Sequence, residues 1–229
     1  MRAMILAAGR GERMRPLTDH TPKPLLLAGG KPLIVWHLEK LARVGIRQVV
    51  INTAHLGEQL PAALGTGARW GLEIFWSPEP PGALETAGGI AHALPYLGDA
   101  PFLVLNGDVF CDWEAFSLAG GLRAEALAHL LLVENPPHHP TGDFVLREAR
   151  VENPSGATGE ETLTFAGIGF YTPALFATCS GDRPAKLAPL LRAAADAGKV
   201  SGERHHGEWV DVGTPERLRA LDEVLSTRI

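Results

Sequence analysis

The sequence predicts an α/β fold of the three-layer α/β/α type, in which helices cover both faces of a mixed, mostly parallel sheet. Apolar runs of strand length alternate with helix-like stretches through the first half of the chain. Two later strand-like runs end in an aspartate. Each aspartate is therefore expected at the carboxyl end of a strand, where open α/β sheets bind their ligands. The 26 glycines and 18 prolines indicate many short loops between the elements.

The first half shows the alternation most clearly. An apolar strand ends at Leu6, and a helix opened by Pro32 carries Ile34 and Leu38 on one face and stops at Gly45. The elements that follow are expected in the order strand 47–54, short helix 56–65, strand 72–77, helix 86–98 and strand 101–108.

The second half is less regular. Thr214 is the expected N-cap of the last helix, because Pro215 follows it and suits the first helical position. No repeat, low-complexity tail or long linker divides the chain, so residues 1–229 are expected to form one domain. The expected elements are strands at 128–135, 163–173 and 207–213, a hairpin at 141–153, and helices at 186–198 and 214–225.

Composition argues against several classes of protein. The formal net charge of −5 disfavours a general nucleic-acid binder, so an anion site must come from a local concentration of cations. Two cysteines without C-x-x-C spacing argue against a disulfide framework or a zinc knuckle. No apolar run is long enough to span a bilayer and no signal-peptide pattern is present, so a cytoplasmic enzyme or binding protein is expected.

The loop within residues 6–26 is the strongest functional signal. Gly9 and Gly11 follow the first strand, where glycines let backbone N–H groups approach an anion closely. The loop is not a dinucleotide fingerprint, because Met14 holds the third glycine position, and no G-K-[ST] of a Walker A loop is present. Its cations lie on a backbone stiffened by proline and suit a polyphosphate; they are Arg10, Arg13, Arg15 and Lys23.

This loop resembles the signature L-A-A-G-x-G-x-R-(M/L)-x-P-L-T-x-x-x-P-K-P-(L/M) of the sugar-1-phosphate nucleotidyltransferases, almost without a break. The arginine and the lysine of the signature fall on Arg13 and Lys23. Residues 84–90 resemble the family's L-x-T-(A/G)-G segment, and residues 208–216 resemble its W-x-D-(I/V)-G-T-P stretch. The chain is therefore similar to this family over most of its length.

The resemblance implies a Rossmann-like nucleotidyltransferase fold and a specific reaction. A sugar 1-phosphate oxygen attacks the α-phosphorus of a nucleoside triphosphate, and pyrophosphate leaves. Residues 1–135 would form the nucleotide-binding half and residues 136–229 the sugar-phosphate-binding half. The implied catalytic residues are Arg13, which would hold the departing phosphates, and Lys23, which would bridge the α-phosphate and the incoming phosphate.

The same resemblance implies Mg²⁺ as cofactor, with Asp108 and Asp211 as its ligands, because this ion prefers hard oxygen donors. The implied nucleotide-binding residues are Leu6, Ala7, Ala8, Gly9, Gly11, Arg13, Lys23, Thr86, Gly88 and Asp108. The implied sugar-phosphate-binding residues are Gly142, Asp143, Glu152, Gly167 and Lys186. Small-molecule substrates are the implied partners, rather than nucleic acid or a membrane.

Over nearly its whole length the chain is similar to the short uridylyltransferases that make UDP-N-acetylmuramate from UTP in bacterial cell-wall recycling. Because little sequence follows its last helix, we expect no C-terminal left-handed β-helix of the kind that longer relatives carry. Three alternatives are a mannose-1-phosphate guanylyltransferase, a choline-phosphate cytidylyltransferase and a catalytically inactive protein that binds nucleotide-sugars. The lactyl carboxylate of N-acetylmuramate would need a nearby cation, for which the candidates are His138, His139, Lys186 and Arg204.

Overall fold

The computed structural model describes residues 1–82, 84–113, 122 and 125–228, and its main feature is a nine-stranded sheet. The strand order is β5-β4-β1-β6-β11-β8-β12-β10-β9. β10 and β11 run against the other strands, so the sheet is mixed and mostly parallel, as predicted. The strands are β1 (Arg2–Leu6), β4 (Gln48–Thr53), β5 (Glu73–Pro78), β6 (Phe102–Asn106), β8 (Ala128–Val133), β9 (Val145–Arg147), β10 (Arg150–Glu152), β11 (Thr164–Tyr171) and β12 (Val200–Arg204).

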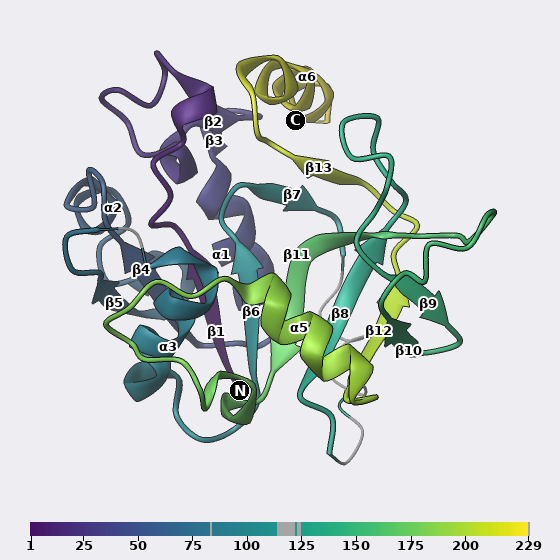
Figure 1. The fold of residues 1–229 in the computed structure, drawn as a ribbon. Helices are drawn as coiled ribbons and strands as arrows, with labels where there is room; N and C mark the ends of the chain where they lie inside the picture. Colours follow the sequence, from purple (N-terminus) through teal and green to yellow (C-terminus); the bar gives the residue numbers. More distant parts are fainter. Residues whose placement is uncertain (83, 114–121, 123–124, 229) are drawn as a thin grey trace.

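Helices cover both faces of this sheet, which confirms the three-layer prediction (Figure 1). Successive residues of a strand face opposite sides of a sheet. On β1, Ala3 and Ile5 belong to the apolar core on the α1 side, whereas Met4 belongs to the core shared with α3 and α5. The helices are α1 (Leu33–Arg43), α2 (Gln59–Leu64), α3 (Glu85–Leu97), α5 (Leu187–Asp196) and α6 (Pro215–Ser226).

A smaller unit joins the loop after β1 to the C-terminal helix. It contains the paired strands β7 (Val109–Cys111) and β13 (Trp209–Asp211), and the pair β2 (Leu27–Ala28) and β3 (Lys31–Pro32). Met14 and Val212 are fully buried in the apolar cluster that α6 contributes to this unit. The predicted N-cap of α6 is confirmed, because the Thr214 hydroxyl accepts a hydrogen bond from the backbone N–H of Arg217 at 3.4 Å.

Four strands escape the sequence pattern: the two-residue strands β2 and β3, and also β7 and β12. β7 has three residues, and within β12 only Val200 is apolar, so neither shows a strand-length apolar run. β12 forms because it pairs with β8 and β10 on either side. Gly202 permits this packing, since a Cβ there would lie 2.7 Å from a methyl carbon of Val151. Tertiary contacts rather than local preference therefore define β12.

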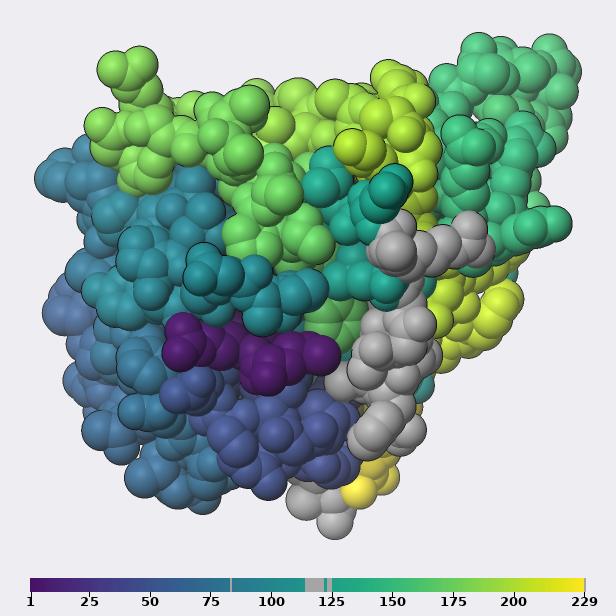
Figure 2. Space-filling model, turned by 90° about the horizontal axis from the view of Figure 1, so that it is seen from below, coloured from purple at the N-terminus to yellow at the C-terminus, as the bar shows by residue number. Residues whose placement is uncertain are grey.

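The ends of the parallel strands decide where a ligand can bind. Figure 2 shows the molecule from below, with the purple N-terminal segment lying between blue and teal segments. β1 starts at this end, so its carboxyl end and those of β4, β5 and β6, which run parallel to it, lie at the opposite end.

Within the described residues, no helix is both long enough and apolar enough to cross a membrane.

Candidate active site

The loop after β1 folds back on itself through a glycine. Gly11 has a positive φ of 63° and begins the 3₁₀ turn Glu12–Met14. A Cβ at Gly11 would lie 2.9 Å from the Thr18 methyl group, and the Thr18 hydroxyl donates a hydrogen bond of 2.8 Å to the Gly11 carbonyl. Only glycine combines this φ with this close approach. The loop therefore keeps its backbone open toward the carboxyl ends of the strands.

A cavity of about 560 Å³ lies between this loop, the start of α3 and the ends of the parallel strands. We call it the first cavity. It brings together nine of the ten residues expected to bind the nucleotide: Leu6, Ala7, Ala8, Gly9, Gly11, Arg13, Lys23, Thr86 and Asp108. Gly88 does not line it. Gly88 instead lets α3 pack on the segment before α5, since a Cβ there would lie 2.6 Å from the Arg183 carbonyl oxygen.

Lys23 provides a fixed positive charge in the wall of the first cavity. It begins the 3₁₀ turn Lys23–Leu25 between two prolines, and only 8% of the residue is exposed. Its Nζ donates a hydrogen bond of 2.5 Å to Oδ2 of Asp108. Because both the backbone and the ammonium group are held, this charge meets an incoming phosphate without first being ordered.

Asp211 lies beside Asp108 because β7 and β13 pair. The register places Asp211 opposite Val109, and the Val212 N–H donates a hydrogen bond of 2.9 Å to the Asp108 carbonyl. Oδ2 of Asp211 accepts a hydrogen bond of 2.8 Å from Arg217. The two carboxylates supply the hard oxygen donors that a divalent cation prefers, so this pair could hold a magnesium ion.

Asn52 organises the base of the first cavity, although sequence reasoning missed it. Its side-chain oxygen accepts a hydrogen bond of 2.7 Å from the Ala7 N–H, and its amide nitrogen donates one of 2.7 Å to Glu79. Gly89 leaves room for this pair, because a Cβ there would lie 2.5 Å from the Glu79 carboxylate. An asparagine near the end of an otherwise apolar strand is the sequence signal that could have identified it.

A second cavity of about 270 Å³ adjoins the first, and Glu85, Thr86 and Asn106 line both. Glu85 has a positive φ of 57°, a strained conformation for this residue type that is typical of functional sites. Asp143 and Lys186, two of the expected sugar-phosphate residues, line the second cavity.

The Asp143 carboxylate is held in place on both of its oxygens. Oδ2 accepts a hydrogen bond of 2.9 Å from the Phe165 N–H, and Oδ1 lies 3.1 Å from Nε2 of His139. These contacts tie the loop before β9 to strand β11. The carboxylate is therefore oriented toward the second cavity before any ligand arrives.

The other three expected sugar-site residues line neither cavity. Gly142 and Gly167 have positive φ values of 61° and 74°, and a Cβ on Gly167 would lie 2.6 Å from the Asn106 amide nitrogen. Gly167 thus supports the shared wall, at the point where the register of β11 shifts. Glu152 lies in the β9–β10 hairpin, where it forms salt bridges of 3.0 Å with Arg147 and 3.4 Å with Arg150.

Further lining residues were not predicted from the sequence. In the first cavity they are Glu12, Met14, Pro24, Asn52, Glu79, Leu84, Glu85, Asn106 and Gly213. In the second they are Glu85, Asn106, Phe144, Phe165, Leu187, Ala188, Leu191 and Arg192. Apart from the asparagines, most belong to loops or helix faces whose position depends on the tertiary fold.

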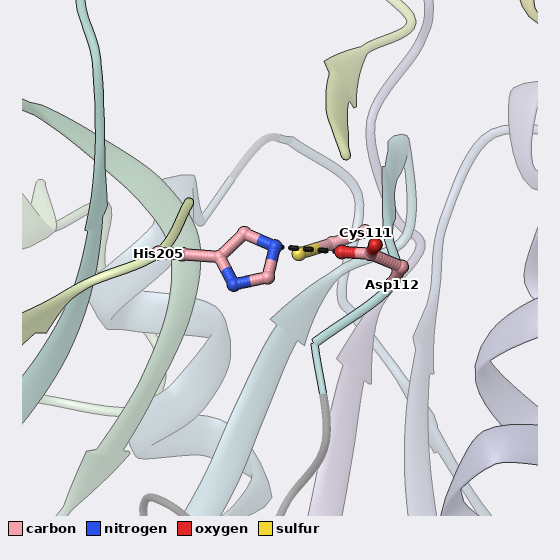
Figure 3. A group of neighbouring side chains, drawn as sticks. All are labelled: Cys111, Asp112 and His205. Carbon is pink, nitrogen blue, oxygen red and sulfur yellow. Dashed lines mark hydrogen bonds and ion pairs between the residues drawn. The ribbon is translucent and has the colours of Figure 1, made fainter. Parts of the chain in front are cut away.

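Another group of possible ligand atoms lies outside both cavities. The ligand atoms of Cys111, Asp112 and His205 lie within 4.8 Å of one another (Figure 3). His205 is hydrogen-bonded to Asp112 at 2.7 Å, and Gly207 leaves room for this pair. Burial raises the pKa of the Cys111 thiol to about 11, so the thiol is protonated at neutral pH in the absence of a metal ion. The described side chains form an Asp–His pair beside a buried thiol.

Comparison with known proteins identifies relatives of this chain. Residues 2–227 match the family model described as nucleotidyl transferase. An N-acetylmuramate alpha-1-phosphate uridylyltransferase from Neisseria meningitidis is 55% identical over 222 residues, which cover 96% of each chain. Another protein of that name, from Caulobacter vibrioides, is 34% identical and covers 98% of this chain and 96% of its own.

Two more distant relatives carry the names of other nucleotidyltransferases. A mannose-1-phosphate guanylyltransferase catalytic subunit beta from Danio rerio is 30% identical over 94% of this chain, but the match covers 62% of its own length. A solved structure from Bacillus anthracis, described as a glucose-1-phosphate thymidylyltransferase, superposes with a TM-score of 0.84 at 21% identity. That superposition covers 99% of this chain and 95% of the other, and it confirms the fold.

Proposed function

The chain belongs to the nucleotidyl transferase family, and we propose that it converts UTP and N-acetylmuramate α-1-phosphate into UDP-N-acetylmuramate and pyrophosphate. The observation that carries this proposal is the 55% identity to a uridylyltransferase of that specificity over 96% of both chains. The guanylyltransferase match is weaker, at 30% identity over 62% of that protein, which argues against the main alternative.

In this proposal the first cavity binds the nucleotide. Backbone N–H groups around Gly9 and Gly11 face the phosphates, as they do in other glycine-rich loops that follow a strand. Arg13 holds the phosphates that leave, and Thr86 lies at the start of α3, close to the base and ribose. The residues of the half 1–135, together with Gly213, supply this side of the site.

The chemical step needs positioning and charge more than a base. The sugar-phosphate oxygen forms a bond to the α-phosphorus while the bond from that phosphorus to the bridging oxygen breaks, and the electron pair leaves with pyrophosphate. The attacking oxygen is already anionic, so no proton has to be removed. In this proposal Lys23, whose ammonium group is held in the wall of the first cavity, contacts the α-phosphate and the incoming phosphate and stabilises the charge that develops between them.

Asp108 and Asp211 are the proposed ligands of a magnesium ion. The donor set fits, because both are carboxylates and the pairing of β7 with β13 makes them neighbours. When bound, such an ion neutralises negative charge on the phosphate oxygens. Lys23 and Arg217 contact the same two carboxylates, so the protein's own cations also limit their mutual repulsion.

The second cavity is the proposed sugar-phosphate site. Asp143 is oriented for hydroxyl or amide groups of the sugar, and Lys186 is placed for its phosphate. Gly167 supports the shared residue Asn106. Gly142 leaves room for Asn135 in the same way, because a Cβ at Gly142 would lie 2.6 Å from the side-chain oxygen of Asn135. Glu152 stays a prediction without a contact to the cavity.

UTP and sugar 1-phosphates are cytoplasmic metabolites, and N-acetylmuramate comes from the bacterial cell wall. We therefore place the proposed reaction in the cytoplasm and in the recycling of peptidoglycan sugars. Its partners are the two small-molecule substrates.

The test is pyrophosphate release with Mg²⁺, in a grid of UTP, GTP, CTP and dTTP against the 1-phosphates of N-acetylmuramate, N-acetylglucosamine, glucose and mannose. We expect turnover to be highest with UTP and N-acetylmuramate α-1-phosphate, and to stop when EDTA removes the metal. Preference for GTP with mannose 1-phosphate would contradict the proposed specificity. Tight nucleotide binding without turnover for any pair would instead favour the inactive binding protein.

A further inference from the structure

We propose that Arg192 recognises the lactyl carboxylate of the sugar, and thereby selects N-acetylmuramate 1-phosphate over neutral N-acetyl sugars. This inference rests on the proposed function. Arg192 lines the second cavity from helix α5, and its guanidinium carbon lies 5.5 Å from the centre of the Phe144 ring. Among the described residues it forms no salt bridge. A carboxylate entering the cavity would therefore meet a cation that no acidic side chain neutralises.

Most other cations near the site already have partners. His138 contacts Arg217 at 2.7 Å and lies 3.5 Å from Asp211. His139 lies beside Asp143, and Arg204 is paired with Glu134 at 3.0 Å and Glu161 at 2.7 Å. None of these three side chains lines the second cavity. Lys186 and Arg192 are the two cations that line it.

The positions of these two cations along α5 suggest different tasks. Lys186 is the N-cap of the helix and follows the segment that packs on the start of α3, near the junction of the two cavities. Arg192 lies six residues further on, which is about 9 Å along an α-helix. The sugar phosphate must reach the junction, so Lys186 suits the phosphate. A carboxylate on the C3 ether extends away from it, so Arg192 suits the carboxylate.

The other residues that line the second cavity indicate why Arg192 suits a sugar that carries a carboxylate. Phe144, Phe165, Leu187 and Leu191 give the cavity apolar surface for the carbon face and methyl groups of an N-acetyl sugar. Asp143, an acidic residue in this wall, is already held by His139 and the Phe165 N–H. A neutral sugar would leave Arg192 with no anionic partner, whereas a lactyl carboxylate can accept hydrogen bonds from its fork of donors.

The experiment compares kcat/KM for N-acetylmuramate and N-acetylglucosamine α-1-phosphates in the wild-type protein and three variants. For Arg192→Gln we expect the ratio of the two values to fall about ten- to a hundredfold, the effect of losing a hydrogen-bonded charge pair. Arg192→Lys should retain part of the preference. Arg219→Gln, which removes an exposed helical arginine paired with Glu216, is the matched control and should keep the wild-type ratio.

The outcomes separate the inference from the proposed function. If the wild-type protein prefers N-acetylmuramate 1-phosphate and Arg192→Gln keeps that preference, the proposed function stands and the role of Arg192 is overturned. If the wild-type protein does not use N-acetylmuramate 1-phosphate, both are overturned. An equal loss with both sugars would also contradict the inference, because it would indicate a general structural role.

Discussion

The two cavities of this protein are built in different ways. The first takes most of its wall from one continuous loop and from the ends of neighbouring parallel strands, and its central cation is fixed between prolines. The second takes its wall from a loop, from β11 and from one face of α5, which are far apart in the sequence. The first cavity therefore presents backbone amides and a fixed charge to a ligand, whereas the second presents individual side chains that can be substituted one at a time.

This difference separates the chemistry from the choice of sugar. Nucleotidyl transfer has the same requirements whatever the sugar is, and we propose that the rigid loop with its held lysine meets them. In our proposal, selection of the sugar depends on single side chains of the second cavity, such as Asp143 and Arg192, which lie outside the loop after β1. Substitutions in the first cavity should thus change kcat most, and those in the second should change KM for the sugar phosphate.

The largest expected effect comes from Lys23→Ala. Loss of one preorganised charge at the transition state typically costs about 2.7–4 kcal/mol, so kcat should fall about 10²–10³-fold. Steady-state pyrophosphate release measures this, after circular dichroism has established that the variant is folded. Lys31→Ala is the matched control, because Lys31 also donates to a carboxylate, that of Glu39, at 2.6 Å but lines neither cavity. Near-normal turnover of Lys23→Ala would remove Lys23 from the mechanism.

The next effect concerns the stability of the folded protein in acid, which we expect to depend on the buried His37. Burial, together with the nearby Lys40, lowers the pKa of His37 to about 4 from its usual 6.5. Between about pH 6.5 and pH 4, His37 is protonated in the unfolded chain but neutral in the folded protein. The free energy of unfolding therefore falls as the pH drops through this range. The loss should be on the order of 3 kcal/mol.

Denaturant unfolding of the wild-type protein and His37→Gln across this pH range measures the effect. Glutamine keeps a polar side chain near the backbone of Val109 and Asn106 and has no group that titrates in this pH range. The variant should lose less stability on acidification, since other titrating groups are common to both proteins. Parallel pH profiles for the two proteins would show that His37 does not bind its proton as argued.

A smaller effect is expected from the glycine that supports the shared wall. Gly167→Ala should lose about 1–3 kcal/mol of stability, because alanine disfavours its positive φ. It should also raise KM for the sugar phosphate, because the new Cβ would displace Asn106. Gly159→Ala has a similar φ of 80° and no atom within 4 Å, so it isolates the backbone contribution. Equal stability and KM in the two variants would argue against a role for Asn106.

The sequence predicts the first cavity better than the second for the same structural reason. A short loop keeps its residues together in space, so the signature from Leu6 to Lys23 identifies residues that line the first cavity, the proposed phosphate site. Asp108 and Asp211 were also identifiable, because each lies at a strand end, and the pairing of β7 with β13 brings them together.

The second cavity could not be assembled from the sequence, because it depends on how α5 packs across the sheet. Arg192 is an ordinary helical arginine by pattern, and only the fold places it over Phe144. Glu152 illustrates the opposite case, since it looked suited to a sugar but pairs with arginines of its own hairpin. Strand β12 was missed because neighbouring strands, rather than apolar residues, define it.

The most direct test of the division between the cavities is a pair of KM values in two variants. Asn52→Ala removes the contacts to Ala7 and Glu79, and Asp143→Ala removes those to Phe165 and His139. We predict that Asn52→Ala raises KM for UTP, that Asp143→Ala raises KM for the sugar phosphate, each about tenfold, and that the other KM changes little. If either variant raised both KM values equally, the assignment of one substrate to each cavity would be contradicted.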